Sequence, residues 1–312
     1  MGLASFSSFV NKISSVLEGG SAIKTSRRIK ESEVPKTIES IEKGLFPLLG
    51  LDPKGMGEQF IFIGSIGKKK SQEDTSGDID LGYDANEFMI RNGVTYRDCS
   101  TKLYEMLSTE IPVTLGDDIE IVNLKGLNIV SLGWPIEGDL SKGIVQLDLI
   151  PIKNMNWAKF IYYSPDYRAD ESKWKSAHRN WLLSAALVAK RKTLSTDDQG
   201  EVLDYETPVL VLPEGLYLQS KTFRGKLKGR LKNPVKIKDA EKFLTDDPQE
   251  FIDFSLGKGY TENDVKTFEK VLDIMTSPDF EMKDKLPEIK KKFIELCERT
   301  GLEIPSEINR LG

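Results

Sequence analysis

The first half of the chain alternates between segments with strand periodicity and segments with helix periodicity. An apolar run at 60–63 leads into a turn at Gly64-Ser65, and Asp78-Ile79-Asp80-Leu81 then repeats with period two. Apolar runs at 119–124 and 127–136 predict a β-hairpin, and the run at 144–151 predicts a further strand. Helical spacing predicts helices at 3–18, 35–49 and 96–107. Together these segments predict an α+β core, with a mixed β-sheet and helices mainly on one face.

The second half has mainly helical spacing. Apolar residues recur every three or four positions from Trp174 through Lys190, and 264–275, 289–299 and the stretch around Glu241 also read as helices. The polar stretch 194–206 reads as a loop, and 207–218 as an apolar segment packed on the core. The predicted organisation is an N-terminal helix and link at 1–34, a core at 35–165, and a mostly helical C-terminal domain at 166–312.

Composition and charge narrow the class of protein. The chain has 312 residues, of which 39% are hydrophobic and 30% charged, as is ordinary for a soluble protein. A net charge of −5 argues against a protein that coats nucleic acid over its whole surface. The two cysteines, Cys99 and Cys297, do not indicate a disulfide framework, and a reduced, cytoplasmic location is expected. No apolar run reaches the length of a membrane span, and the amphipathic stretch 3–18 is expected to dock on its own protein.

Three aspartates are the candidate catalytic residues. In the period-two stretch, Asp78 and Asp80 project from one face of a strand, while the apolar residues project from the other. Asp148 stands in the apolar strand at 144–151. If the two strands pair side by side, the three carboxylates form a cage, and such charges repel one another unless a cation lies between them. Hard oxygen ligands of this kind suit a divalent cation such as Mg²⁺ or Mn²⁺ as the cofactor.

This pattern resembles the nucleotidyltransferase superfamily that includes DNA polymerase β, poly(A) polymerases and CCA-adding enzymes. The matching features are the apolar strand, Gly64-Ser65, the Asp78-x-Asp80 strand after a spacer, and Asp148 on a later strand. The resemblance covers roughly residues 35 to 165. It departs from the family at Gly77, where many relatives carry Ser, and in the Lys68-Lys69-Lys70 run inside the spacer. The resemblance implies a nucleotidyltransferase core that uses two Mg²⁺ ions bound by Asp78, Asp80 and Asp148.

Several further residues are candidates for binding phosphate. Gly64 allows close backbone approach and Ser65 offers a hydroxyl donor, whereas a plain strand-ending turn is the alternative. Lys68 lies in the spacer, where a solvated loop is the alternative reading. In relatives, the helix after the third-Asp strand supplies basic groups to the nucleotide, which makes candidates of Lys175, His178 and Arg179, with a helix-surface or structural role as the alternative for each.

A basic stretch at 220–238 suggests a polyanion partner. It contains eight Lys and Arg residues and has no acid before Asp239, in a chain that is acidic overall. A charged, solvated surface face is the alternative, because Phe223 is the only aromatic residue there.

The predicted function is a metal-dependent transfer of NMP from an NTP to an acceptor hydroxyl, with release of pyrophosphate. An RNA 3′ end ranks first as acceptor because of the lysine-rich stretches. Synthesis of an oligonucleotide second messenger comes next, followed by modification of a protein or small molecule. From another class, a catalytically silent nucleic-acid-binding or assembly module is the alternative, although such a protein would have no need of a mutually repelling cage.

Overall fold

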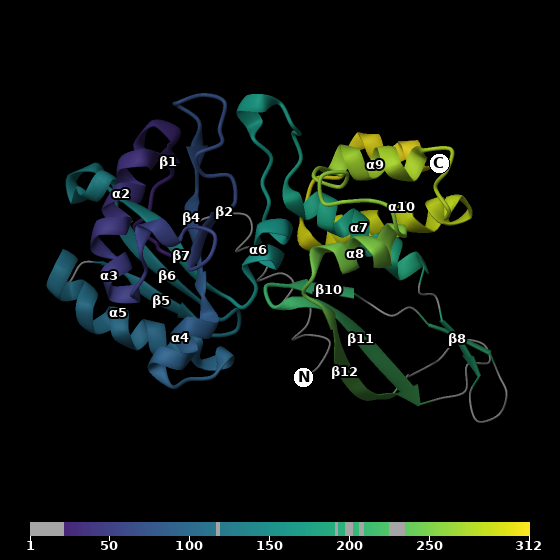
Figure 1. Ribbon diagram of the computed structural model, residues 1–312, viewed down its shortest axis with the longest axis horizontal. Coiled ribbons are helices and arrows are strands. Elements are labelled where there is room, and N and C mark those ends of the chain that lie inside the picture. The colour runs from purple at the N-terminus through teal and green to yellow at the C-terminus, as the bar shows by residue number, and fades with distance from the viewer. Residues whose placement is uncertain (1–21, 117–118, 191–192, 197–201, 206–208, 225–234) are drawn as a thin grey trace. The chain divides into compact units, whose positions relative to one another are not determined.

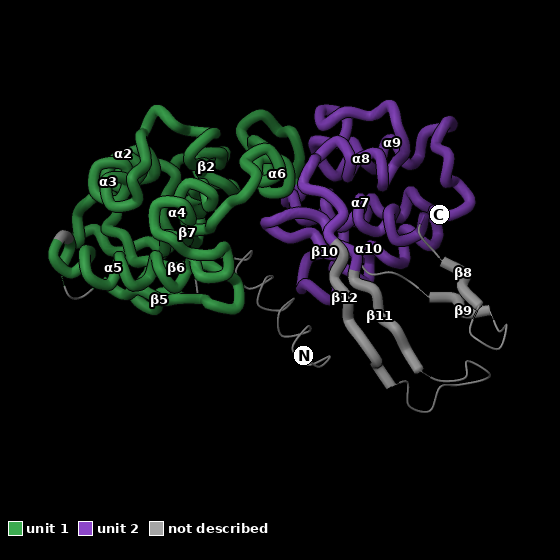
Figure 2. The backbone as a smooth tube through the Cα atoms, turned by 60° about the horizontal axis from the view of Figure 1, so that its bottom comes forward, with its two compact units in different colours: residues 1–173 green, residues 174–312 purple. Residues whose placement is uncertain are grey.

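The chain divides into two compact units, residues 1–173 and 174–312 (Figure 2). The computed structural model describes residues 22–116, 119–190, 193–196, 202–205, 209–224 and 235–312. The helix predicted at 3–18 lies outside the described residues. None of the helices in the described ranges is long and apolar enough to cross a membrane. The sequence placed the boundary between the two halves at residue 166, whereas the units divide between Lys173 and Trp174.

Unit 1 is built on a five-stranded mixed sheet with the strand order β2-β4-β7-β6-β5 (Figure 1). The parallel pair β4–β7 lies at its centre, and the other neighbours are antiparallel. The predicted hairpin at 119–136 is confirmed as β5 and β6. The strands are β2 Phe60–Ile63, β4 Asp78–Asp84, β5 Ile121–Leu124, β6 Ile129–Pro135 and β7 Ile144–Ile152, and β1 Ile29–Lys30 pairs separately with β3 Thr75–Ser76.

Helices cover both faces of this sheet, unequally. Ile79, Leu81 and Leu147 belong to a large buried core with residues of four helices on one face. On the other face, Ile150 and Ile152 pack with Ala158 of α6 in a smaller cluster. The structure therefore has the predicted mixed sheet, with helices mainly on one face. The helices are α2 Val34–Gly44, α3 Phe46–Leu49, α4 Ala85–Asn92 and α5 Cys99–Leu115 on the first face and α6 Met155–Ile161 on the second, with short 3-10 helices at Glu31–Glu33, Pro53–Gly55, Tyr96–Asp98, Ile136–Gly138, Leu140–Lys142 and Tyr167–Ala169.

Local sequence accounts for where several of these helices begin and end. The carboxylate of Asp84 accepts hydrogen bonds from the Asn86 and Glu87 N–H groups at the start of α4. Gly93 ends the same helix with φ +63°, a conformation that glycine adopts without strain. The side chain of Asn154 caps α6 in the same way as Asp84 caps α4. β4 and β7 are therefore each followed directly by a capped helix.

Unit 2 contains a helical group around α7, the helix predicted through Lys190. This helix is buried along most of its length and contacts α8, α9 and α10. The predicted helices at 264–275 and 289–299 are observed as α9 and α10. The helices are α7 Ser176–Lys190, α8 Pro248–Leu256, α9 Phe268–Thr276 and α10 Leu286–Thr300, with 3-10 helices at Lys283–Lys285 and Ser306–Leu311.

The prediction of a mostly helical second domain is wrong in part, because unit 2 also contains five strands within its described residues. The stretch read as a loop at 194–206 contains an antiparallel pair, and the stretch read as a helix around Glu241 is a long strand. Its pairing partner lies some twenty residues earlier in the chain, so local spacing alone does not reveal it. The strands are β8 Thr193–Thr196, β9 Val202–Tyr205, β10 Val209–Leu212, β11 Gly215–Arg224 and β12 Val235–Thr245, the last three forming one sheet.

Candidate metal centre

Strand pairing places the candidate carboxylates side by side. β4 and β7 are parallel neighbours, and their register sets Asp80 directly beside Asp148 and Asp78 beside Gln146. Because side chains alternate along a strand, Ile79 and Leu81 enter the helix-covered core while both acids of β4 project from the opposite face. The period-two pattern in the sequence thus arises because one face of β4 packs in the core and the other carries the acids.

The three carboxylates form a compact cluster. One oxygen from each of Asp78, Asp80 and Asp148 can be chosen so that all three lie within 4.8 Å of one another. Asp78 and Asp80 are partly exposed, whereas Asp148 is fully buried. The cluster therefore has a solvent-facing side and a buried side.

The environment raises the pKa values of two members of the cluster. Burial raises the pKa of Asp80 well above its usual range, and the charges of Asp78 and Asp148 add to that effect. Burial also raises the pKa of Asp148 to about 6, and the charge of Asp78 acts in the same direction. Hydrogen bonds to Asp148 from Ser131 and Gln146 oppose this rise. Negative charge is thus concentrated where water cannot fully stabilise it.

Gly64 follows β2 and lies against the cluster. It has φ +79°, a left-handed conformation that favours glycine. A Cβ atom at this position would stand 3.1 Å from Oδ2 of Asp80. Residues 64–67, including the half-buried Ser65, form turns, so no helix begins at this described turn. Glycine therefore lets the backbone pass close to a carboxylate of the cluster.

The spacer loop that carries Lys68 is fastened to the residues after α6. The ammonium of Lys68 donates to the carbonyl of Ser164 at 2.9 Å and lies 5.3 Å from the ring centre of Tyr163. Lys69 lies over Tyr167 in the same manner, at 5.0 Å. These contacts hold the loop within unit 1, and they give Lys68 a structural role in addition to the predicted phosphate contact.

Lys175, His178 and Arg179 belong to unit 2. Lys175 directly precedes α7, and its carbonyl accepts the N–H of His178. His178 is 3% exposed, and its Nε2 lies 2.9 Å from the carbonyl of Glu303. Burial lowers the pKa of His178, so the neutral imidazole is favoured.

Arg179 is similarly enclosed, at 2% exposure. It donates to the side-chain oxygen of Asn180 at 2.8 and 3.2 Å and to the carbonyl of Lys266 at 3.4 Å. For both His178 and Arg179, the described contacts favour the structural alternative.

The basic stretch 220–238 is described only in part. Its ends lie in β11 and β12, with Thr222 opposite Lys238 and Arg224 opposite Val235. Residues 225–234 lie outside the described residues, including Lys226, Lys228, Arg230 and Lys232.

Two residues that contact Asp148 were not among the sequence candidates. Ser131 on β6 donates its hydroxyl to Oδ1 of Asp148 at 2.6 Å, and Gln146 donates its amide at 2.9 Å to Oδ1 and 3.0 Å to Oδ2. Gln146 stands two residues before Asp148 on the same strand, so alternation alone could have indicated it. Ser131 depends on the β6–β7 register, which the sequence does not specify.

Comparisons of the chain with protein-family models, with curated proteins and with solved structures gave no match.

Proposed function

We propose that this protein is a metal-dependent nucleotidyltransferase, which transfers NMP from an NTP to an acceptor hydroxyl. The observation that carries the proposal is the cluster of Asp78, Asp80 and Asp148 on two adjacent parallel strands, beside a left-handed glycine turn. The sequence resemblance to nucleotidyltransferases rests on the same residues. Neither feature depends on the positions of the residues in unit 2.

The cluster fits a divalent cation. Two oxygen ligands of one Mg²⁺ ion stand at most about 4.2 Å apart, because each Mg–O distance is about 2.1 Å. Carboxylate oxygens within 4.8 Å of one another can therefore share an ion once the side chains move closer together. Two unit charges at 4 Å repel by about 4 kcal/mol at an effective dielectric constant of about 20, and a bound cation removes this cost. The donor set also suits Mn²⁺ and Ca²⁺, and the proposal of Mg²⁺ or Mn²⁺ comes from the resemblance.

In the proposed reaction, the acceptor oxygen bonds to the α-phosphorus of the NTP while the bond from that phosphorus to the α–β bridging oxygen breaks. Pyrophosphate leaves with the electron pair of the broken bond, and the hydroxyl proton passes to Asp148 or to water. Divalent cations bound at the cluster would activate the hydroxyl and neutralise the leaving pyrophosphate. Asp78 and Asp80 would hold both cations, and Asp148 would complete the site of the cation that activates the hydroxyl and could accept the hydroxyl proton. Gly64 and Ser65 would bind the triphosphate.

For the acceptor, we propose an RNA 3′ end. The support is the basic stretch 220–238 in a chain of net charge −5. Because fold alone does not specify a substrate, the acceptor needs its own test.

The experiment is incubation of the purified protein with each labelled NTP, Mg²⁺ or Mn²⁺, and total RNA. We expect labelled RNA and pyrophosphate from the wild type, and neither product from the double variant Asp78→Asn with Asp80→Asn. Asp148→Asn should lower turnover by at least about 10²-fold with little change in NTP affinity. The matched control is Asp139→Asn, the same change at an exposed residue whose carboxylate accepts the Ser141 N–H.

Two of the alternatives predict other results in the same experiment. A second-messenger synthase would form oligonucleotides from NTP without RNA. A silent module would bind RNA and form no pyrophosphate with any NTP, and that outcome would contradict the proposal.

A further inference from the structure

The buried amide of Gln146 connects the third carboxylate to the chain before β1. Gln146 is 3% exposed, and it precedes Asp148 by two residues on the face of β7 that carries the cluster. We propose that Gln146 is a positioning residue, which fixes the Asp148 carboxylate for cation binding through hydrogen bonds from an uncharged group. This inference rests on the proposed function only in that Asp148 binds the cation.

The surroundings fix the orientation of the Gln146 amide. Its Oε1 accepts the backbone N–H groups of Ala22 at 3.0 Å and Ile23 at 3.1 Å. A flipped amide would set its own N–H donors against these two donors and lose both hydrogen bonds. The NH₂ group therefore faces Asp148.

The amide donates to both oxygens of the carboxylate, at 2.9 and 3.0 Å, and the Ser131 hydroxyl adds a hydrogen bond to Oδ1. All three groups are fully or almost fully buried. Both donors are uncharged, so Asp148 is held in place while its full negative charge stays available to a cation. A lysine or arginine at either position would neutralise that charge.

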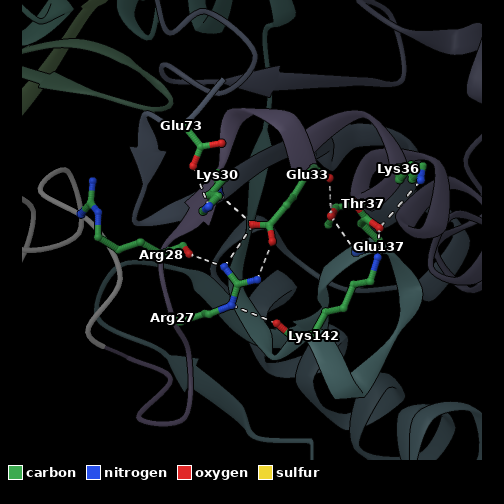
Figure 3. Close-up of polar contacts among 9 residues, drawn as sticks. All are labelled: Arg27, Arg28, Lys30, Glu33, Lys36, Thr37, Glu73, Glu137 and Lys142. Atoms are coloured by element: carbon green, nitrogen blue, oxygen red, sulfur yellow. Dashed lines mark hydrogen bonds and ion pairs between the residues drawn. The ribbon is translucent and has the colours of Figure 1, made fainter. Parts of the chain in front are cut away.

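The backbone that presents the Ala22 and Ile23 N–H groups is itself fastened to unit 1. The Arg27 N–H donates to the carbonyl of Ile144 at 2.8 Å, next to the start of β7. The Arg27 guanidinium donates to a carboxylate oxygen of Glu33 at 2.6 Å and to the carbonyl of Lys142 at 2.9 Å. Figure 3 shows both contacts as dashed lines. Because these contacts anchor the segment, its N–H groups act as fixed donors to Gln146.

The test is the Mn²⁺ dissociation constant of the full-length protein, measured by calorimetry, for Gln146→Met in two backgrounds. Methionine keeps the side-chain length but removes the amide. In the wild-type background we expect Mn²⁺ affinity to fall by about 10- to 100-fold, as is usual for groups that orient a metal ligand. In the Asp148→Asn background the same change should have no further effect, because it acts through that carboxylate.

The matched control is Gln59→Met. Gln59 also accepts a backbone N–H, from Asp52 at 3.0 Å, but it lies beyond the opposite end of β4 from Asp78. We expect the Mn²⁺ affinity of the Gln59→Met variant to equal that of the wild type. If Gln146→Met does not fold, as judged by thermal unfolding in chelator, Gln146→Asn takes its place, since its shorter side chain keeps an amide but does not span both contacts.

Two outcomes would overturn the inference: unchanged affinity in Gln146→Met, or an equal loss in both backgrounds, which indicates a general structural effect. Failure of the proposed function gives a separate signature. A wild type that binds Mn²⁺ and transfers no nucleotide, with affinity that falls in Gln146→Met, would refute the transferase and keep the role of Gln146.

Discussion

The pKa of Asp148 is raised to about 6 although two neutral donors hydrogen-bond its carboxylate. The rise has two causes, burial and the charge of Asp78, which together outweigh the hydrogen bonds. Between about pH 4 and pH 6, Asp148 of the metal-free protein therefore holds a proton that an exposed aspartate would have lost. The raised pKa means that ionising Asp148 costs more free energy in the folded chain, because burial and the charge of Asp78 both disfavour the carboxylate.

A pH dependence of stability follows from this shift. An unfolded aspartate has a pKa of about 3.9, so between about pH 4 and pH 6 the folded state binds more protons than the unfolded state. Asp148 should therefore contribute a loss of stability to the metal-free protein as pH rises through that range, on the order of 2 kcal/mol. Urea unfolding in chelator at about pH 4 and about pH 8 measures the change, and Asp148→Asn should reduce it. An equal pH dependence in wild type and variant would contradict the assigned pKa.

Alanine substitutions at two glycines of one loop can distinguish the effect of backbone strain from the effect of contact with the cluster. Gly64 and Gly67 both have positive φ, +79° and +72°, but only a Cβ at Gly64 would meet Asp80, since one at Gly67 meets nothing within 4 Å. Alanine at either position should destabilise the fold by about 1–2 kcal/mol. Only Gly64→Ala should also weaken Mn²⁺ binding. Calorimetric titration of both variants checks this, and an equal loss of affinity would mean that strain alone is responsible.

At the scale of elements, the parallel pairing of β4 with β7 creates the site. An antiparallel strand flanks this pair on each side, β2 beside β4 and β6 beside β7. β6 supplies Ser131, and β2 leads into Gly64. Helices fill the opposite face of the same strands. A shift of register by one residue would turn the aspartates into the helix-covered core.

The basic stretch that spans β11 and β12 has its own prediction. Each phosphate contact to single-stranded nucleic acid contributes about −0.7 to the slope of log affinity against log salt concentration. Changing Arg224, Lys228 and Lys232 to Glu should weaken RNA binding and flatten that slope. Mn²⁺ affinity should stay unchanged, because the proposed ligands lie in unit 1. Filter binding at several salt concentrations measures both. If affinity and slope survive, the stretch is a solvated face and the RNA acceptor loses its main support.

At the scale of the whole molecule, all three carboxylates belong to one compact unit. A cation that binds the folded state and not the unfolded chain stabilises the folded state by RT ln(1 + [L]/Kd). This term reaches about 2.7 kcal/mol at a cation concentration 100 times Kd.

Saturating Mg²⁺ or Mn²⁺ should therefore raise the unfolding temperature by several degrees, since 1 kcal/mol corresponds to about 2–4 °C in chains of about 150–250 residues. Scanning calorimetry with cation and with chelator measures the shift. The double change Asp78→Asn with Asp80→Asn should abolish the shift, and Asp139→Asn should preserve it. A shift that persists in the double variant would place the cation elsewhere.

Much of unit 1 could be predicted from the sequence, because its signals are local. Ile79 and Leu81 alternate with Asp78 and Asp80, and this pattern by itself specifies a strand with both acids on one face. The hairpin at 119–136 likewise follows from spacing over a few residues, as does the helix after Trp174 in unit 2.

What the tertiary structure decided depends on contacts between distant residues. Around β12, Ile237, Ala240 and Leu244 have helical spacing, yet the segment pairs with β11 and is a strand. The sequence marks Asp148 as a candidate, but only the β4–β7 register sets it beside Asp80, and only the packed segment at Ala22 and Ile23 orients Gln146 toward it. The physical reason is that periodicity records which face of an element is buried, whereas register and hydrogen-bond partners are fixed by the chain segments that pack against it.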